Sequence, residues 1–349
     1  MSFKNKSSKI RVYFQQGIHK FKGRRYLCLV KTEIGQDIQQ AISLLKKGQT
    51  VAIPTETVYG LAADATNEDA VLKIFESKGR PTSNPLILHF ANIESIYPYV
   101  SEFPETLLAL ARQFSPGPIT FILPKSSLVP ALITAGQDTV AVRVPAHKMT
   151  LDLLRSIDFP IAAPSANRYG GISPTTAAHV QMQLDGRIPY ILDGGACQTG
   201  LESTIVGLAN EKVIVYRLGG ISIEALSESL SYVPEIKNEL HHGVRTSGMV
   251  KYHYATETPL YFMETEQQAY TDSDGFILFS KKNHPTKSEQ HFYLSEEGNM
   301  NEAAKNLYAA LHDMDQKGFK RIFIEAFPSD GLGKTMNDRL KRATAKFSK

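Results

Sequence analysis

The sequence predicts an α/β protein with two domains, a larger one built on a mixed sheet and a smaller one at the C-terminus. Stretches with helical spacing alternate with short β-rich runs between about residues 37 and 230, and a second alternation begins after Pro259. The chain has 349 residues, enough for two domains with separate cores. Several β-rich runs follow one another without a helix between them, so we expect parallel and antiparallel pairs in one sheet.

The first unit of the larger domain is predicted to be strand, helix, strand. Residues 51–53 and 86–89 have the composition of short buried strands, and apolar residues within 71–75 recur at helical spacing. Further helices are predicted at 37–47, 105–114 and 175–184, and further strands at 119–123, 139–144, 203–208 and 213–216. The loops at the strand ends carry Thr55, Glu56, Thr57 and Asn84, where binding groups usually lie.

Changes in composition divide the chain into four segments. Residues 1–32 hold nine Lys or Arg and no Asp or Glu, which indicates a basic arm that either contacts RNA or is a solvated tail. Residues 33–230 form the larger domain, and the polar, histidine-containing stretch 231–258 is predicted to be a linker. Residues 259–349 form the second domain, with strands expected at 276–279 and 321–325 and a helix at 301–316.

The composition excludes several classes of protein. No apolar run approaches the roughly 20 residues that a membrane helix needs, and the N-terminus lacks the apolar core of a secretory signal. We therefore expect a cytoplasmic protein without a membrane association. The two cysteines, Cys28 and Cys197, have no metal-binding spacing, so we expect neither a disulfide framework nor structural zinc.

A pair of cations, Lys78 and Arg80, lies at the end of the first predicted helix. One interpretation is a helix stop, in which Gly79 is the C-cap, the cations face the negative end of the helix dipole, and Pro81 prevents continuation. The other is that the two cations converge on a polyanion such as nucleotide phosphates. The spacing is compatible with both.

Residues 161–176 lead from an apolar strand into a loop rich in Ser, Asn and Gly. Such a loop exposes backbone N–H groups and hydroxyls that suit phosphate oxygens. The alternative is a turn and a helix start, with Ser173 as N-cap and Pro174 in the first helical position.

Two further residues stand at the ends of predicted strands. His89 ends an apolar strand, which favours a hydrogen-bonded core histidine. Arg143 interrupts a β-rich run, and a buried arginine needs an anionic partner. A substrate carboxylate and an Asp or Glu of the protein would serve equally.

Common catalytic signatures are missing. The segment 331–335, GLGKT, resembles the end of a phosphate loop, but the first glycine of that motif would fall on Pro328. No GxSxG, HExxH or GxGxxG pattern is present. The sequence therefore does not indicate a P-loop NTPase, a serine esterase, a zinc protease or a dinucleotide-binding enzyme.

Ten motifs in fixed order resemble one known family. They are PTETVYGL, KGRP, NPLILH, PGPITFIL, TVAVRVP, APSAN, SPT, DGG, ESTIV and RLGG, over residues 54–220. The chain resembles the YrdC-like family of threonylcarbamoyl-AMP synthases, in the longer form with a linker and a C-terminal domain. The resemblance implies a YrdC-like domain with a twisted mixed sheet flanked by helices, and a small Rossmann-like C-terminal domain.

The reaction that this resemblance implies joins L-threonine, bicarbonate or CO2, and ATP into L-threonylcarbamoyl-adenylate with release of pyrophosphate. Mg²⁺ is expected to enter with ATP and not at a protein metal site. The product is expected to pass to a separate tRNA threonylcarbamoyl-transferase complex, which modifies the adenosine beside the anticodon. We expect a monomer in which the nucleophile belongs to the substrate and the protein positions charges.

The resemblance also assigns site residues. It implies threonine contacts at Thr57, His89, Arg143 and Ser203. It places Lys78 and Arg80 at the catalytic centre, and ATP contacts at Arg80, Asn84, Thr139, Ser165, Asn167, Ser173, Arg217 and Tyr254. The group that accepts the amine proton stays open between Glu56 and Asp193.

The linker departs from the family pattern SPGM-x-Y-x-HYAP. Both prolines are absent, and Lys251 replaces the first tyrosine, whereas Tyr254 still matches. Two other functions use related domains: an RNA-binding module, and carbamoyl transfer in hydrogenase maturation. The second lacks support because the zinc-finger cysteines and the acylphosphatase-like segment that accompany it are missing.

Overall fold

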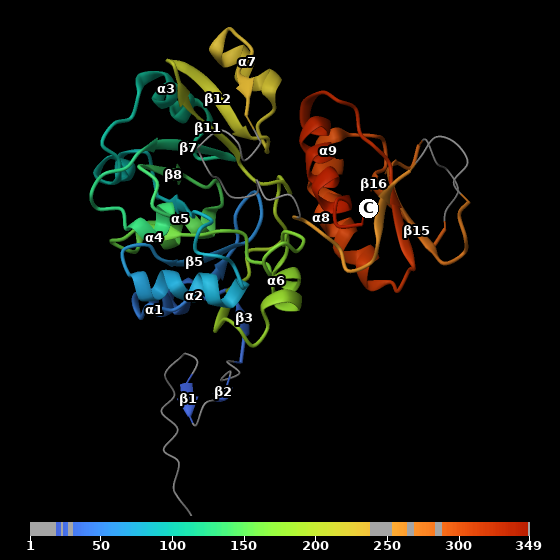
Figure 1. Cartoon of the computed structure of the whole chain (residues 1–349), viewed down its shortest axis with the longest axis horizontal. Helices are drawn as coiled ribbons and strands as arrows, with labels where there is room; N and C mark the ends of the chain where they lie inside the picture. The colour runs from blue at the N-terminus through green and yellow to red at the C-terminus, as the bar shows by residue number, and fades with distance from the viewer. Residues whose placement is uncertain are drawn as a thin grey trace, which may run out of the picture.

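The computed structural model describes residues 19–21, 24–26, 31–237, 253–263, 269–282 and 288–347. Figure 1 shows a larger body, coloured blue to yellow, beside a smaller orange and red one. Within the predicted basic arm, β1 (His19–Phe21) pairs with β2 (Arg24–Tyr26) in an antiparallel sheet of their own. The remainder of the arm up to residue 30, with Cys28, lies outside the described residues.

An eleven-stranded sheet forms the centre of the larger body, in the order β13-β12-β11-β7-β8-β6-β9-β5-β4-β10-β3. Its parallel pairs include β6 with β8 and β7 with β11, and its antiparallel pairs include β4 with β5 and β7 with β8. The mixed sheet is confirmed. The strands are β3 (Glu33–Gly35), β4 (Val51–Ile53), β5 (Gly60–Asp64), β6 (Ile87–His89), β7 (Ile119–Pro124), β8 (Thr139–Arg143), β9 (Ile161–Ala162), β10 (Tyr190–Leu192), β11 (Thr204–Ala209), β12 (Lys212–Arg217) and β13 (Glu235–Ile236).

Helices flank this sheet. They are α1 (Ile38–Lys46), α2 (Glu68–Lys78), α3 (Glu105–Phe114), α4 (Ala131–Thr134), α5 (Lys148–Arg155), α6 (Ala177–Leu184), α7 (Ile223–Leu230) and the 3₁₀ helix at Glu94–Tyr99. Helix α2 begins because Asn67 accepts a hydrogen bond from the Ala70 amide, and it ends at Gly79, which has a φ of 65°. The helix stop that the sequence suggested at Gly79 is therefore present.

The two faces of the sheet differ in character. Leu88, Phe121 and Val142 point into the main core, which the helices cover. Because side chains alternate between faces along a strand, the neighbouring residues Ile87, Ile122 and Ala141 point the other way, where they form a small apolar cluster with Ile205, Ile214 and Tyr216. His89 and Arg143 share this second face, since they pair beside each other at the ends of β6 and β8. On the same face Ile161, which pairs with His89, belongs to a second core under α1 and α5, so the polar groups lie beside that core.

The structure corrects three local predictions. The strand, helix and strand of the first predicted unit are present as β4, α2 and β6, but an unpredicted strand, β5, forms a hairpin with β4 before α2. Strand β5 has the sequence GLAAD, whose small residues have weak strand propensity, so only burial in the sheet reveals it. Helix α6 begins after Thr176, whose side chain accepts from the His179 amide, so Ser173 is not its N-cap. Strand β13 lies within the stretch predicted to be linker and pairs with β12.

The smaller body has a four-stranded sheet in the order β14-β17-β15-β16, and all of its pairs are parallel. Its elements are β14 (Leu260–Phe262), β15 (Asp274–Ser280), β16 (His291–Ser295), α8 (Met300–Gln316), β17 (Arg321–Ile324) and α9 (Gly331–Thr344). The predicted second α/β fold is confirmed. The GLGKT segment forms the first turn of α9 and not a phosphate loop.

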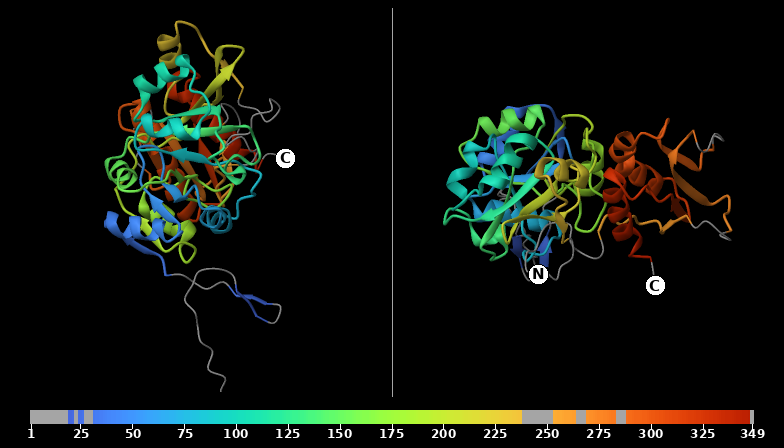
Figure 2. Two further views of the ribbon diagram at one scale, coloured as in Figure 1. Left: turned by 90° about the vertical axis from the view of Figure 1, so that its left-hand side faces the viewer. Right: turned by 90° about the horizontal axis from the view of Figure 1, so that it is seen from above.

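Helices α8 and α9 lie on the side of the smaller sheet that faces the larger body (Figures 1 and 2). The apolar core of the smaller body includes Val58, Ile172 and Leu201 from the larger one, so the two bodies share a continuous core.

No helix in the described ranges is long and apolar enough to span a membrane.

Candidate functional site

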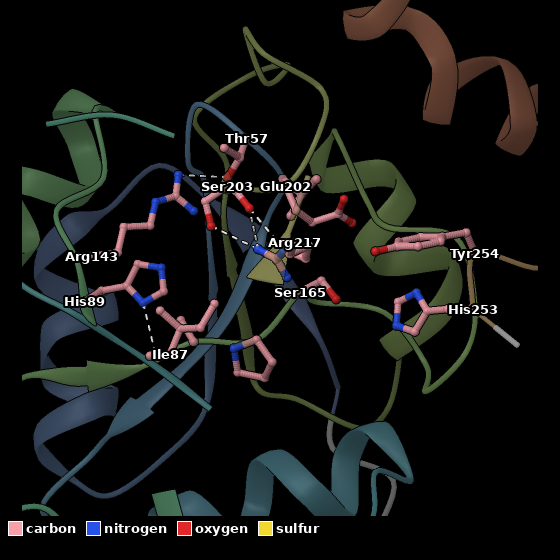
Figure 3. A pocket seen from close by; sticks show the side chains of 13 residues that line it. Thr57, Ile87, His89, Arg143, Ser165, Glu202, Ser203, Arg217, His253 and Tyr254 are labelled. Carbon is pink, nitrogen blue, oxygen red and sulfur yellow. Dashed lines mark hydrogen bonds between the residues drawn. The ribbon is translucent and has the colours of Figure 1, made fainter. Parts of the chain in front are cut away.

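A pocket opens over the polar face of the sheet, where the two bodies meet. Figure 3 shows Arg143 and His89 on one side of this pocket, and His253 and Tyr254 on the other, with Ser203 and Arg217 between them. The lining residues are Thr57, Val58, Ile87, His89, Arg143, Ala163, Pro164, Ser165, Glu202, Ser203, Arg217, His253 and Tyr254. All four residues assigned to threonine are among them, together with three assigned to ATP: Ser165, Arg217 and Tyr254.

Arg143 is held by the loop that follows β4. Its Nη2 donates to Glu56 Oε1 at 2.6 Å and to Thr57 Oγ1 at 2.9 Å, and its Nε donates to the Gly117 carbonyl at 3.3 Å. Glu56 Oε2 accepts from the Ala146 amide at 3.0 Å. Glu56 is therefore the protein carboxylate that compensates the buried Arg143, one of the two partners that the sequence left open. The Nη1 group makes no hydrogen bond with the described residues, so both of its N–H donors lack a protein acceptor there.

His89 is a neutral imidazole in this site. Burial, with a smaller contribution from Arg143, lowers the pKa of His89 to about 3. Its Nδ1 lies 3.1 Å from the Ile87 carbonyl, and a carbonyl can only accept, so Nδ1 carries the proton. The Nε2 lone pair is then a hydrogen-bond acceptor beside the Arg143 cation. The predicted core histidine is hydrogen-bonded, and it also lines the pocket.

The floor of the pocket joins β11 to β12. Arg217 donates from Nε and Nη2 to the Ser203 carbonyl at 3.0 and 2.9 Å, and from Nη2 to Ser203 Oγ at 2.9 Å. The Ser203 hydroxyl also lies 2.7 Å from Thr120 Oγ1. Burial lowers the pKa of Arg217 to about 10, so the guanidinium stays charged near neutral pH.

Glu202 is a buried carboxylate that lines the pocket. It accepts from Ser173 Oγ at 2.7 Å, from the Tyr308 hydroxyl at 2.9 Å and from Arg339 Nε at 3.0 Å. Burial alone would raise the pKa of Glu202, but Arg339 and Arg217 outweigh it and hold the pKa at about 2. The carboxylate is thus ionised and fully engaged.

The pair His253 and Tyr254 closes the pocket from the linker. The two rings lie 4.1 Å apart, and Tyr254 stacks on Tyr308 at 5.5 Å. Tyr254 has a φ of 65°, an uncommon conformation for a residue with a side chain. His253 Nδ1 is buried without a hydrogen-bond partner among the described residues. The preceding part of the linker, with Lys251, lies outside the described residues.

The remaining predicted residues do not line this pocket. Lys78 is buried and donates from Nζ to the Ser165 and Asn167 carbonyls, so it holds the APSAN loop. Burial, and then Arg80, lower the pKa of Lys78 well below its usual range. Asn167 Nδ2 donates to the Gly171 carbonyl at 2.9 Å and stabilises the same loop.

Arg80 and Asn84 contact each other directly. Arg80 Nη2 donates to Asn84 Oδ1 at 2.7 Å and to the Pro85 carbonyl at 2.8 Å. Burial lowers the pKa of Arg80 to about 10. Tyr169 raises this pKa and the Arg217 cation lowers it, so the charges of Arg80 and Arg217 repel each other. Thr139 opens β8, four residues before Arg143, and lies about 13 Å along the strand from it.

Of the two candidate proton acceptors, Glu56 lies beside the pocket and Asp193 does not line it. Asp193 Oδ1 accepts from the Tyr59 hydroxyl at 3.2 Å and from the Gly195 amide at 2.9 Å. Cys197 is free and buried, and burial raises the pKa of its thiol to about 12, so it is not a nucleophile near neutral pH.

Several residues of the site were not singled out from the sequence. They are Glu202, Thr120, His253, Tyr308 and Arg339. For Arg339 the sequence contained one indication of a buried role. This residue interrupts the buried apolar stripe of Met336, Leu340 and Ala343 on α9. A charge within an apolar helical stripe indicates a buried partner.

We predict that the protein loses stability as the pH falls below about 6.5, the ordinary pKa of histidine. Burial lowers the pKa of His89, His253 and His312 to about 3 each. Between these values the unfolded chain binds protons that the folded chain does not, so each histidine removes up to about 1.4 kcal/mol per pH unit. Thermal unfolding measured from pH 7.5 to 5 should show a falling Tm.

The matched control for this prediction is His312→Gln, because a side-chain amide can still donate to the Ser173 carbonyl, which lies 3.3 Å from His312 Nε2. The variant should lose less stability on acidification than the wild type. A Tm that stays constant between pH 6.5 and 5 would contradict the prediction.

Fold and site define an α/β protein whose pocket is lined by the buried cations Arg143 and Arg217. Two sequence-family models match the chain: the Sua5/YciO/YrdC model, described as telomere recombination, over residues 43–219, and the model described as threonylcarbamoyl-AMP synthase, C-terminal domain, over residues 221–345. The threonylcarbamoyl-AMP synthase of Pyrococcus abyssi is 38% identical over 320 residues, which cover 88% of this chain and 94% of that protein.

A second relative and a solved structure agree. The threonylcarbamoyl-AMP synthase of Bacillus subtilis is 37% identical over 338 residues, 92% of this chain and 98% of that protein. The crystal structure of P. abyssi Sua5 complexed with L-threonine superposes with a TM-score of 0.79 at 35% identity, covering 90% of this chain and 97% of that one. The chain therefore belongs to the threonylcarbamoyl-AMP synthase family of enzymes, in the form with a C-terminal domain, and the predicted family is confirmed.

Proposed function

We propose that this enzyme joins L-threonine, bicarbonate or CO2, and ATP into L-threonylcarbamoyl-AMP, with release of pyrophosphate. The observation that carries the proposal is the pocket in which Arg143, His89, Thr57 and Ser203 converge. Its chemistry suits an amino acid, and the P. abyssi relative is described as a complex with L-threonine.

The threonine subsite is proposed at the Arg143 side of the pocket. Arg143 Nη1 is the donor for the threonine carboxylate, which would replace water on a guanidinium already fixed by Glu56 and Thr57. The neutral His89 offers Nε2 as an acceptor for the substrate amine or hydroxyl. Since Glu56 is engaged by Arg143 and the Ala146 amide, we favour for it a positioning role over that of proton acceptor.

The ATP subsite is proposed at the pocket floor, where the charge of Arg217 adds to that of Arg80 beside the pocket. Both keep a pKa of about 10 despite burial, so both are cations at neutral pH. Ser165 contributes a hydroxyl, Tyr254 a ring, and Lys78 with Asn167 holds the loop that presents Ser165. Asn84 orients Arg80.

Two residues assigned to ATP have less support. For Ser173 we propose an indirect role through Glu202, and Thr139 is the assigned residue with the least support.

The chemistry needs no protein nucleophile. The threonine nitrogen attacks CO2 and loses a proton, and the carbamate oxygen attacks the α-phosphorus of ATP while the bond to pyrophosphate breaks. The protein aligns the three substrates and stabilises the developing charge, which is worth roughly 7–11 kcal/mol where alignment is good.

Magnesium is proposed to enter with ATP. Within the described residues no group of three or more His, Cys, Asp or Glu could hold a metal ion. Glu202 in the pocket and Glu56 beside it have both oxygens engaged, so phosphate oxygens and water would supply most ligands. Bound there, the ion would neutralise phosphate charge.

We further propose that the product serves the threonylcarbamoylation of tRNA by a separate transferase complex in the cytoplasm, and that the enzyme works as a monomer. The first point follows from the chemistry of the product, an activated threonylcarbamoyl group, which is the product that the names of the relatives describe. The basic arm of residues 1–32 is the proposed place for a weak RNA contact.

The test is pyrophosphate release from ATP by the purified full-length protein. We expect release only when threonine and bicarbonate are both present, because the carbamate is the nucleophile. Omitting either substrate provides the control. Release that does not depend on threonine would contradict the synthase assignment, and a folded protein without release that binds RNA with a steep salt dependence would favour the RNA-binding alternative.

A further inference from the structure

Helix α9 of the C-terminal domain places one buried arginine against the wall of the pocket. Arg339 is 1% exposed. Its Nε donates to Glu202 Oε2 at 3.0 Å, its Nη2 to the Leu218 carbonyl at 2.5 Å, and its Nη1 to Asp338 Oδ2 at 2.5 Å. One planar group therefore joins two segments of the larger domain that are distant in sequence.

Both segments carry pocket residues directly next to the contact. Glu202 precedes Ser203, and Leu218 follows Arg217. Arg217 in turn donates to the Ser203 carbonyl, so Arg339 closes a ring of contacts around the pocket floor. A second contact from α9 supports the same loop: Thr335 Oγ1 donates to the Gly219 carbonyl at 3.2 Å.

The same arginine holds the wall formed by Tyr254. The guanidinium carbon of Arg339 lies 5.3 Å from the centre of the Tyr254 ring, within the range of a cation–π contact. Tyr308 of α8 stacks on the Tyr254 ring and donates its hydroxyl to Glu202. Arg339 and Tyr308 thus fix Glu202 and Tyr254 together from the C-terminal domain.

The contact between the bodies is closely packed. Gly200 has a φ of +72°, and a Cβ there would lie 2.5 Å from the backbone of Lys305 on α8. Tyr254 and Leu201 belong to the same apolar core as Leu307 and Leu340. A packed interface of this kind holds the C-terminal domain in a defined position relative to the pocket.

We propose that Arg339 is a positioning residue for the reaction, through which the C-terminal domain fixes Ser203, Arg217 and Tyr254 in the geometry that ATP and threonine require. This inference rests on the proposed function for its kinetic readout. It gives the C-terminal domain a role in completing the site of the larger domain.

The charge on Glu202 supplies an independent readout. Glu202 is faced by charged and titratable groups from four elements, namely Arg339 on α9, Tyr308 on α8, Arg217 on β12, and His253 and Tyr254 on the linker. Among these groups, Arg339 lowers the pKa of Glu202 the most and so favours the ionised carboxylate. Without Arg339 the pKa of Glu202 should rise, so protonation would enter the working pH range as the pH falls.

The experiment compares Arg339→Met with Arg342→Met in the full-length protein. Arg342 lies on the same helix and pairs with Asp338, so its loss tests for general damage to α9. We expect Arg339→Met to reduce kcat/KM for ATP about ten-fold or more, since it removes a buried partner of a charged group. Its activity should also fall more steeply than that of the wild type between pH 8 and 6, and Arg339→Lys should restore part of it.

Hydrogen exchange gives a readout that does not need activity. Arg339→Met should increase exchange in residues 201–204 and 217–220, whereas Arg342→Met should not. The inference is overturned if Arg339→Met is folded and keeps the wild-type kinetics, pH profile and exchange. It is also overturned if both variants lose activity in proportion to their Tm. If the wild type itself releases no pyrophosphate, the proposed function fails, and the exchange data alone decide the role of Arg339.

Discussion

Replacing Arg143 by methionine is expected to remove threonine binding while ATP binding persists. The charged hydrogen bonds between Arg143 and a ligand carboxylate are worth about 1.5–3 kcal/mol each, so kcat/KM for threonine should fall roughly 100-fold or more. The measurement is pyrophosphate release at varied threonine, with calorimetry of threonine and ATP separately.

The same substitution should also destabilise the fold, and a second variant separates the two effects. Removing Arg143 leaves Glu56 buried without its partner at 2.6 Å, which costs about 3–5 kcal/mol in comparable pairs. Arg143→Met combined with Glu56→Gln should recover most of the lost Tm and none of the threonine affinity. Threonine binding that returns with stability would show that Arg143 acts only as a structural partner of Glu56.

Replacing Arg80 by alanine is expected to have the second large effect, now on ATP. Arg80 is buried and cationic, and its charge adds to that of Arg217. Loss of a preorganised cation at the transferring phosphate typically costs a factor of about 100 or more in kcat/KM, or about 2.7 kcal/mol. Pyrophosphate release should collapse, while threonine binding by calorimetry should be close to that of the wild type.

Two controls accompany this variant. Arg112→Ala removes a cation of the same type from the surface, where its pair with Glu105 is exposed, and should leave the kinetics unchanged. Arg80→Lys keeps the charge but loses the planar donor set that reaches Asn84 and Pro85, so it should recover only part of the rate. A folded Arg80→Ala protein with full activity would exclude phosphate binding at this position.

Local patterns in the sequence determined most helices and the central strands. The helix α3 was predicted with its observed bounds, and the apolar stripe of α8 appears as Ala303, Leu307, Leu311 and Met314. These elements are readable because hydrophobic periodicity is a local property of the chain. The ordered motifs, with His89 and Arg143 at strand ends, likewise indicated the family and the residues of the pocket.

Only the tertiary structure shows which charged side chains contact each other. Residues 56 and 143 are 87 positions apart, and residues 202 and 339 are 137 apart, so no local pattern pairs them. The sequence left open whether Arg143 faces a substrate or a protein carboxylate, and the fold brings Glu56 to it. Strand pairing and domain packing determine such contacts, because they depend on long-range burial and not on neighbouring residues. For the same reason, the place of the C-terminal domain against Glu202 and Tyr254 could be found only in three dimensions.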